Sequence, residues 1–205
     1  STQVVNIHAG TYDGTAGSAI AIPTLSITGD AVVEPNETIN LTLSTPLGDV
    51  SLGGQITTTY TINNDDSVTV EFSQATGAAA ENVGNNLPSL FITGTVANTS
   101  SVTITGGGSA APGTDYTLTS PQAVNIPAGS YDGTAGTAIA IPTLGITGDA
   151  VLEPNETINL TLSAPVGDVT LGGQTTTTYT ITNDDTAAII IADTDGNEDD
   201  GAISV

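Results

Sequence analysis

Apolar and polar residues alternate with a period of two in several short segments of the chain. Val68, Val70 and Phe72, for example, are separated by Thr69 and Glu71. Because successive side chains of a β-strand point to opposite faces, this alternation predicts half-buried strands, and no 3.6-residue helical period competes with it. Further candidate strands lie near 89–96, 101–105, 116–119, 122–126, 137–146, 158–162 and 178–182.

These segments are rich in Val, Ile and Thr and are interrupted by Gly, Pro, Asn and Asp, a composition typical of strands joined by turns. Apolar residues make up 38% of the chain, enough for a folded core despite its charge. Roughly seven strands within one sequence unit predict an all-β fold, an antiparallel β-sandwich.

The chain repeats itself at an offset of 119 residues. Residues 1–66 align with residues 120–185, and 54 of these 66 positions are identical. Residues 67–185 are interpreted as one complete repeat, residues 1–66 as the C-terminal half of another, and residues 186–205 as the start of a third. Residues 1–66 would then have uncovered strand edges and core positions, and we expect preceding sequence or another copy to supply the missing half.

Almost all of the ionisable side chains in the chain are acidic. It has 22 acidic residues, no Lys or Arg and a single His, for a net charge of −22. Such a surface repels nucleic-acid phosphates and anionic lipids, so we expect neither nucleic-acid binding nor direct membrane insertion. No apolar run approaches the roughly 18 residues of a membrane-spanning helix. The absence of Cys excludes thiol chemistry and disulfides.

Most acidic residues of the complete repeat fall in loops or at strand ends. The parity of the strand crossings in an antiparallel sandwich predicts that four acidic segments converge at one pole. Clustered carboxylates without basic partners can stay separately solvated, raise their pKa values or bind a hard cation. Calcium takes six to eight oxygen ligands, whereas loops without His or Cys disfavour zinc and copper. The seven carboxylates are Glu81, Asp115, Asp149, Glu153, Glu156, Asp184 and Asp185.

Three motifs occur in the order "GTDY", "GDAVLEPNETINLTLSAPVGDVTLGG" and "TYTITNDD". Together they resemble the Calx-β motif of sodium–calcium exchangers and of many large surface proteins. The resemblance covers all of 67–185 and the matching half in 1–66. It implies immunoglobulin-like β-sandwiches in tandem, some of which bind clusters of calcium ions at the pole where these loops meet.

The resemblance also implies which residues bind Ca²⁺. In the complete repeat they are the seven carboxylates above, together with the carbonyl of Val151. Gly148 and Asn183 stand where exchanger-type sites often have an acidic residue, which implies fewer ions or weaker binding. The counterparts retained in the first repeat are Asp30, Glu34, Glu37, Asp65 and Asp66.

The segment "DTDGNEDDG" near the C-terminus has two interpretations. Asp193, Asp195 and Asn197 fit the start of an EF-hand loop, but Ser204 occupies the twelfth position, where a Glu is needed. We prefer the interpretation as the first inter-strand loop of another repeat, with Glu198 in the role of Glu81.

Catalytic chemistry has little support in the sequence. His8 is the only imidazole, and Pro127 replaces it in the next repeat. Glu153 and Glu156 have the residue types of a glycosidase pair, but aromatic residues are only 3% of the chain, which leaves no sugar-binding platform.

The sequence therefore predicts a non-enzymatic, extracellular structural segment of a long surface fibre, adhesin stalk or sheath. Calcium would stiffen the joints between repeats, and the partners would be neighbouring repeats or other copies, possibly in a filament. The alternative is a calcium-regulated module for cell adhesion or ligand binding.

Overall fold

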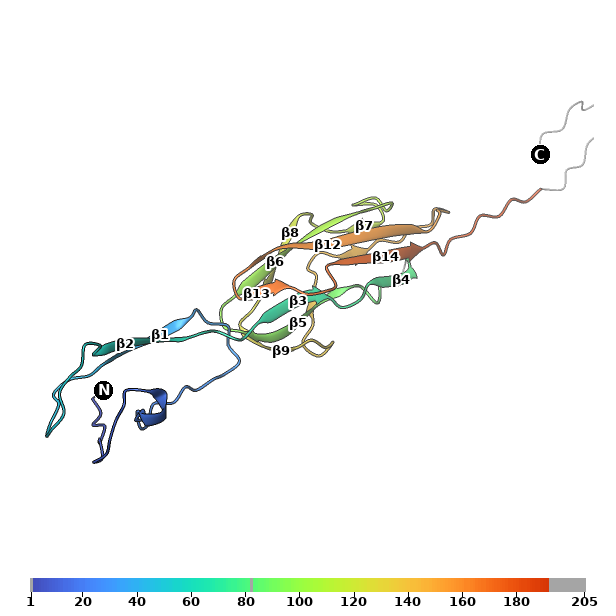
Figure 1. Ribbon diagram of the computed structural model, residues 1–205. Coiled ribbons are helices and arrows are strands. Elements are labelled where there is room, and N and C mark those ends of the chain that lie inside the picture. The colour runs from blue at the N-terminus through green and yellow to red at the C-terminus, as the bar shows by residue number, and fades with distance from the viewer. Residues whose placement is uncertain (1, 82, 192–205) are drawn as a thin grey trace, which may run out of the picture. The chain divides into compact units, whose positions relative to one another are not determined.

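The computed structural model describes residues 2–81 and 83–191, and its regular structure is almost entirely β (Figure 1). The chain divides into two compact units. The first comprises the residues up to Asp30 together with Pro35–Asn64, and the second comprises Ala31–Glu34 and the residues from Asp65 onward. The predicted all-β fold class is confirmed.

The first unit contains one pair of strands. In it, β1 (Glu37–Thr42) runs antiparallel to β2 (Thr57–Ile62), and six residue pairs join them. A three-residue 3₁₀ helix, η1 (Ala16–Ser18), precedes the pair. No helix in the described part of the chain has the length and apolar character needed to cross a bilayer.

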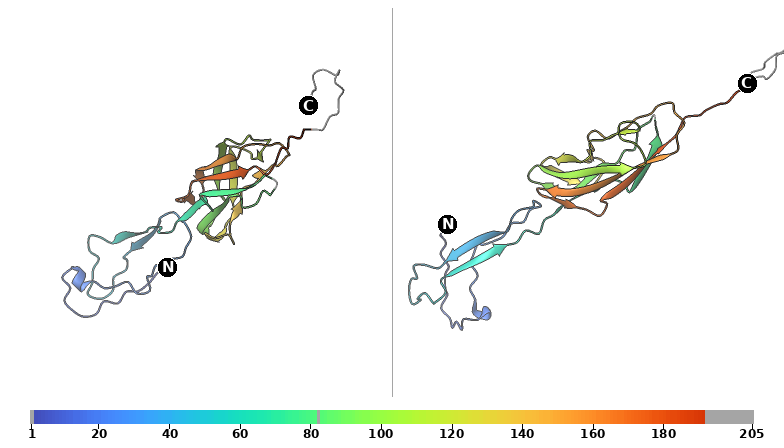
Figure 2. Two further views of the ribbon diagram at one scale, coloured as in Figure 1. Left: turned by 90° about the vertical axis from the view of Figure 1, so that its right-hand side faces the viewer. Right: turned by 90° about the horizontal axis from the view of Figure 1, so that it is seen from above.

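The second unit is a sandwich of two five-stranded sheets (Figure 2). The first sheet has the order β10 (Ile139–Ala140), β5 (Ser89–Val96), β3 (Val68–Phe72) and β13 (Val169–Leu171), with β9 (Gly129–Asp132) also paired to β5. The second has the order β4 (Thr76–Ala80), β14 (Thr176–Thr182), β12 (Glu156–Val166), β6 (Ser100–Gly108) and β8 (Gln122–Ile126). A separate short pair joins β11 (Gly145–Ile146) to β7 (Tyr116–Thr117).

The core lies between the two sheets and follows the predicted alternation. In β12 the inward residues Ile158, Leu160 and Leu162 are at most 3% exposed, and Asn159 and Thr161 between them are exposed. In β3 the side chains of the apolar positions are buried in the same alternating pattern. Period-two patterning therefore identifies the central strands correctly, because one face of each is packed against the opposite sheet.

The chain changes sheets between β3 and β4. β3 belongs to the first sheet, whereas β4 lies parallel to β14 at the edge of the second. The backbone N–H of Glu81, directly after β4, donates to the carbonyl of Thr182 at 3.3 Å. This crossing carries Glu81 to the pole where β14 ends, so it places the first acidic segment next to the last.

The structure corrects the predicted strand list at several points. The segment 137–146 is two short strands, β10 and β11, separated by a turn in which the N–H of Leu144 donates to the carbonyl of Ile141. Pro142 in this turn has no N–H to offer a sheet. Three strands were not predicted. β4 has the sequence TGAAA and no apolar–polar alternation, and β9 and β13 have only four and three residues.

Removal of a core side chain in β12 tests this architecture. Leu160 is 1% exposed, so Leu160→Ala should lower the free energy of unfolding of the second unit by about 2–5 kcal/mol. The matched control is Leu41→Ala in β1, which belongs to the other unit and should leave the second unit unchanged. Hydrogen exchange of β6 and β12 amides in urea measures both, and a cost below about 1 kcal/mol for Leu160→Ala would contradict the packing.

Candidate metal centre

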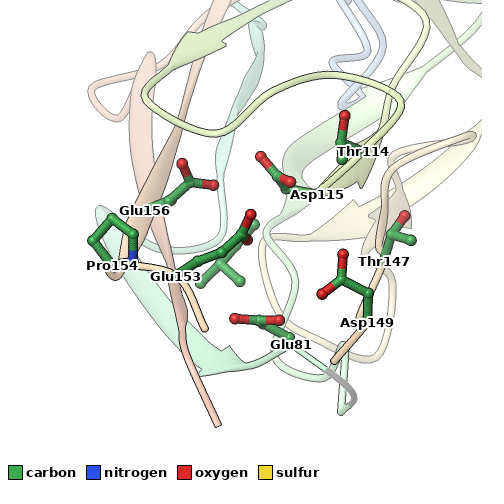
Figure 3. A pocket seen from close by; sticks show the side chains of 9 residues that line it. Glu81, Thr114, Asp115, Thr147, Asp149, Glu153, Pro154 and Glu156 are labelled. Carbon is green, nitrogen blue, oxygen red and sulfur yellow. The ribbon is translucent and has the colours of Figure 1, made fainter. Parts of the chain in front are cut away.

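Acidic side chains from segments far apart in the sequence line one pocket at a pole of the sandwich. Figure 3 shows their carboxylates pointing toward a common space. The lining residues are Glu81, Thr114, Asp115, Thr147, Asp149, Glu153, Pro154, Glu156 and Ile181. The structure therefore brings together carboxylates from the residue after β4, the residue before β7, the loop before β12 and the first residue of β12.

Glu81 is the most deeply buried of these acids, with 6% of its surface exposed. The protein has no Lys or Arg to pair with its carboxylate. Burial raises the pKa of Glu81, and the negative charges of Asp185, Asp184, Glu153 and Asp149 raise it further. A buried carboxylate is costly unless something neutralises its charge.

Asp115, Glu153 and Glu156 form one closely spaced group, with one carboxylate oxygen from each within 4.8 Å of the others. A hydrogen bond to Asp115 is the main cause that raises the pKa of Glu156 to about 7, with smaller contributions from burial and neighbouring charges. The loop before β7 holds Asp115 in place, because its Oδ2 accepts from the N–H of Ala111 at 2.5 Å.

Glu81, Asp184 and Asp185 form a second such group, again with oxygens within 4.8 Å of one another. Asp185 is half-buried, and its Oδ2 is a buried atom without a hydrogen-bond partner among the described residues. This group joins the residue after β4 to the two residues beyond β14, where the chain leaves the sandwich.

Asn183 holds these segments in position, a role that sequence reasoning missed. Its Oδ1 accepts from the N–H of Glu153 at 3.0 Å, and its Nδ2 donates to the carbonyl of Asp185 at 2.9 Å. Its own N–H donates to Oδ1 of Asn155 at 3.1 Å. Sequence reasoning treated Asn183 only as a lost acid. The sequence did carry a signal for this role, because both repeats have an Asn in "EPNE" and another in "NDD". The hydrogen bond between these two Asn residues is present in the first unit as well, where the N–H of Asn64 donates to Oδ1 of Asn36 at 2.9 Å.

The remaining predicted residues of the complete repeat are placed less centrally. Asp149 lines the pocket and its Oδ1 accepts from the N–H of Val151 at 2.7 Å. Val151 itself is 55% exposed. The hydroxyl-bearing residues Thr114 and Thr147 also line the pocket, and no motif pointed to them.

The acids of the first repeat do not assemble in the same way. Within the described residues, no group of three close carboxylates includes Asp30, Glu34, Glu37, Asp65 or Asp66. The reason lies in the repeat itself, because both groups in the complete repeat need Glu81 or Asp115, which belong to residues 67–119. Glu198, the predicted ligand of the third repeat, lies outside the described residues.

No family model matches the chain, and no curated protein sequence matches it. Solved structures do. In fold, the chain is similar to Calx CBD domains. The apo form of the Calx CBD1 domain has a TM-score of 0.47 and 21% identity, and the match covers 58% of this chain and 100% of that one.

Two structures of CBD12 give similar values. CBD12 from CALX1.2 has a TM-score of 0.45 and 21% identity, and the calcium binding domain CBD12 of CALX1.1 has 0.46 and 22%. Each match covers 57% of this chain and 44% of the matched chain, so the chain spans less than half the length of these two.

The raised pKa of Glu156 predicts how the stability of the metal-free protein depends on pH. The ordinary value is 4.5 and the folded value about 7, so between these limits the unfolded chain loses this proton first. Stability in EDTA should therefore fall as pH rises from 4.5 to 7 and level off above. The raised pKa of Glu81 also makes stability fall as pH rises. The lowered pKa of Asp132 affects stability only below its ordinary value of 3.8, outside this pH range.

Thermal melts at pH 4.5–8 in EDTA measure this dependence. Glu156→Gln should flatten its part of the slope and raise Tm at pH 7.5, while the matched variant Glu37→Gln should keep the wild-type slope. A wild-type slope in Glu156→Gln would contradict the assignment.

Proposed function

We propose that residues 67–185 form a calcium-binding module whose ligands are the carboxylates of the pocket at the pole of the sandwich. The observation that carries the proposal is the burial of Glu81 among acidic side chains from other segments of a protein that has no Lys or Arg. A bound cation would supply the missing positive charge.

The donor set suits calcium better than other metals. Every charged side chain at the pocket offers oxygen, and Thr114 and Thr147 add hydroxyl oxygens. Calcium accepts six to eight such ligands at irregular angles, whereas magnesium demands nearly ideal octahedral geometry and keeps much of its water. The buried Oδ2 of Asp185, which has no hydrogen-bond partner within the part of the chain that the structure describes, is an available ligand atom in this set.

Calcium bound here would have a mechanical effect. Glu81 follows β4, whereas Asp184 and Asp185 follow β14 and precede the segment that leads out of the sandwich. A cation shared by these carboxylates would fasten the first residues of that exit segment to the pole. The chain's departure from the repeat would then be stiffer with calcium than without it.

We further propose that the chain is a non-enzymatic, extracellular structural segment of a long surface fibre, adhesin stalk or sheath. The identity of 54 in 66 positions between repeats supports a structural array, because near-identical copies provide uniform units and no specialised binding loop. Calcium sites of extracellular modules have dissociation constants of about 10⁻⁴–10⁻³ M, which matches a site with fewer acidic residues than exchanger-type sites have. The partners would be neighbouring repeats or further copies of the chain.

Melting curves with EDTA and with 10 mM calcium test the binding. Saturation near 100 times the dissociation constant adds about 2.7 kcal/mol, equivalent to a rise in Tm of roughly 10 °C. Glu156→Gln should lose most of this rise, and Glu37→Gln should retain it. Identical Tm values in EDTA and calcium, with no heat of calcium binding in calorimetry, would contradict the proposal. A magnesium titration should give a smaller rise.

The structural role has a separate test. Electron microscopy of the native material, imaged in calcium and after chelation, should show extended filaments or stalks that become more flexible when calcium is removed. Compact monomeric particles in both conditions would contradict a fibre or stalk, whatever the result of the calcium titration.

A further inference from the structure

The side chain of Asn183 is bonded to both of the carboxylate groups at the acidic pole. Its Oδ1 accepts from the N–H of Glu153, which belongs to the group that includes Asp115, at 3.0 Å. Its Nδ2 donates to the carbonyl of Asp185, which belongs to the group that includes Glu81, at 2.9 Å. One uncharged side chain therefore joins the backbones of two segments that carry acidic residues of different groups.

The two partners fix the orientation of the Asn183 amide. The N–H of Glu153 requires an acceptor, and the carbonyl of Asp185 requires a donor. If the amide were turned over, its NH₂ would face an N–H and its oxygen would face a carbonyl oxygen. Position 183 therefore uses a donor and an acceptor on one short planar group, which Asn provides and Asp does not, because an ionised carboxylate only accepts.

The backbone of Asn183 adds a third bond, and this bond does not depend on the acidic pole. The N–H of Asn183 donates to Oδ1 of Asn155 at 3.1 Å, and the equivalent bond from Asn64 to Asn36 forms in the first unit at 2.9 Å. Within the described residues, neither Asn64 nor Asn36 lies in a unit with a close group of three carboxylates from its own repeat. The local sequence is thus sufficient to hold these two positions together.

Asn183 acts through its neighbours and not as a ligand. It is absent from the described residues that line the pocket, and its amide atoms are already bonded to backbone groups. The residues that it holds do belong to the site, because Glu153 lines the pocket and Asp185 has a buried Oδ2 close to Glu81. Asn183 therefore has the contacts of a positioning residue.

We propose that Asn183 strengthens calcium binding at the pole by holding the two carboxylate groups in one arrangement before the ion arrives. This inference rests on the proposed function of residues 67–185. Ligands that are already ordered lose less conformational freedom on binding. Residues that orient metal ligands typically contribute about 10–100-fold to metal affinity. Asn183 is then a contributor to the site and not simply a missing acid.

Two substitutions separate position from charge. Asn183→Ala removes both side-chain bonds without adding a charge. Asn183→Asp keeps an acceptor for the N–H of Glu153, loses the donor to the carbonyl of Asp185 and adds a negative charge. If charge alone set the affinity, Asn183→Asp would bind calcium more tightly than the wild type. Positioning predicts that both variants bind more weakly, with a loss of about 10-fold or more for Asn183→Ala.

Calorimetric titration of the full chain with calcium, at a temperature where every variant is folded, measures this effect. The matched control is Asn64→Asp, which adds the same charge at the equivalent position of the first repeat and should keep the wild-type affinity.

Hydrogen exchange in EDTA supplies a readout that needs no metal. The amide of Glu153 should lose its protection in Asn183→Ala and keep it in Asn183→Asp, because only the first substitution removes its acceptor. The amides of β6 and β12 should be protected as in the wild type, which shows that the sandwich is intact.

Three results would overturn the inference while calcium binding by the wild type stands. They are wild-type or tighter binding by Asn183→Asp, wild-type binding by Asn183→Ala, and unchanged exchange of the Glu153 amide in Asn183→Ala. A wild-type chain that binds no calcium would overturn the proposed function, and the effect of Asn183 on affinity would fall with it. The titration of the wild type therefore distinguishes the two failures.

Discussion

The packing of residues 67–119 against residues 120–185 is the interaction on which both the core and the acidic pole depend. Ten of the nineteen core residues in the described sandwich come from one side of this contact and nine from the other. The pole is divided in the same way, because Glu81 and Asp115 come from the first half and Glu153, Glu156 and Asp185 from the second. The hydrophobic core and the candidate metal centre therefore depend on the same contact between the two halves of the repeat.

The second constraint is a charge that the chain does not neutralise itself. The sandwich brings carboxylates together as a consequence of its topology, and it buries Glu81 among them without a basic partner. The raised pKa of Glu156, about 7, is the response of this pole in the absence of a cation. A proton and a bound cation would compete for the same oxygens, so folding, pH and the proposed metal binding would be thermodynamically linked at this site.

Much of this arrangement could be predicted from the sequence, because burial on one face leaves a period of two in strands such as β3 and β12. The parity of the strand crossings also predicted that the acidic segments meet at one pole. What escaped prediction depends on contacts between distant segments. The Ala-rich β4 carries no alternation, so the crossing that buries Glu81 was not visible. The role of Asn183 was missed because this uncharged residue acts through three hydrogen bonds to neighbouring segments.

The same physics explains why two nearly identical segments behave differently. Residues 1–66 reproduce the pairing of β12 with β14 in β1 and β2, down to the bond between Thr59 and Asn40, so local sequence is sufficient for the strand pair. It is not sufficient for burial, because Tyr60 stays 53% exposed without the strands that cover its counterpart. Nor is it sufficient for the acidic groups, which need Glu81 and Asp115. Hydrophobic burial and carboxylate clustering are thus properties of the completed sandwich, whereas strand register is a property of the half-repeat.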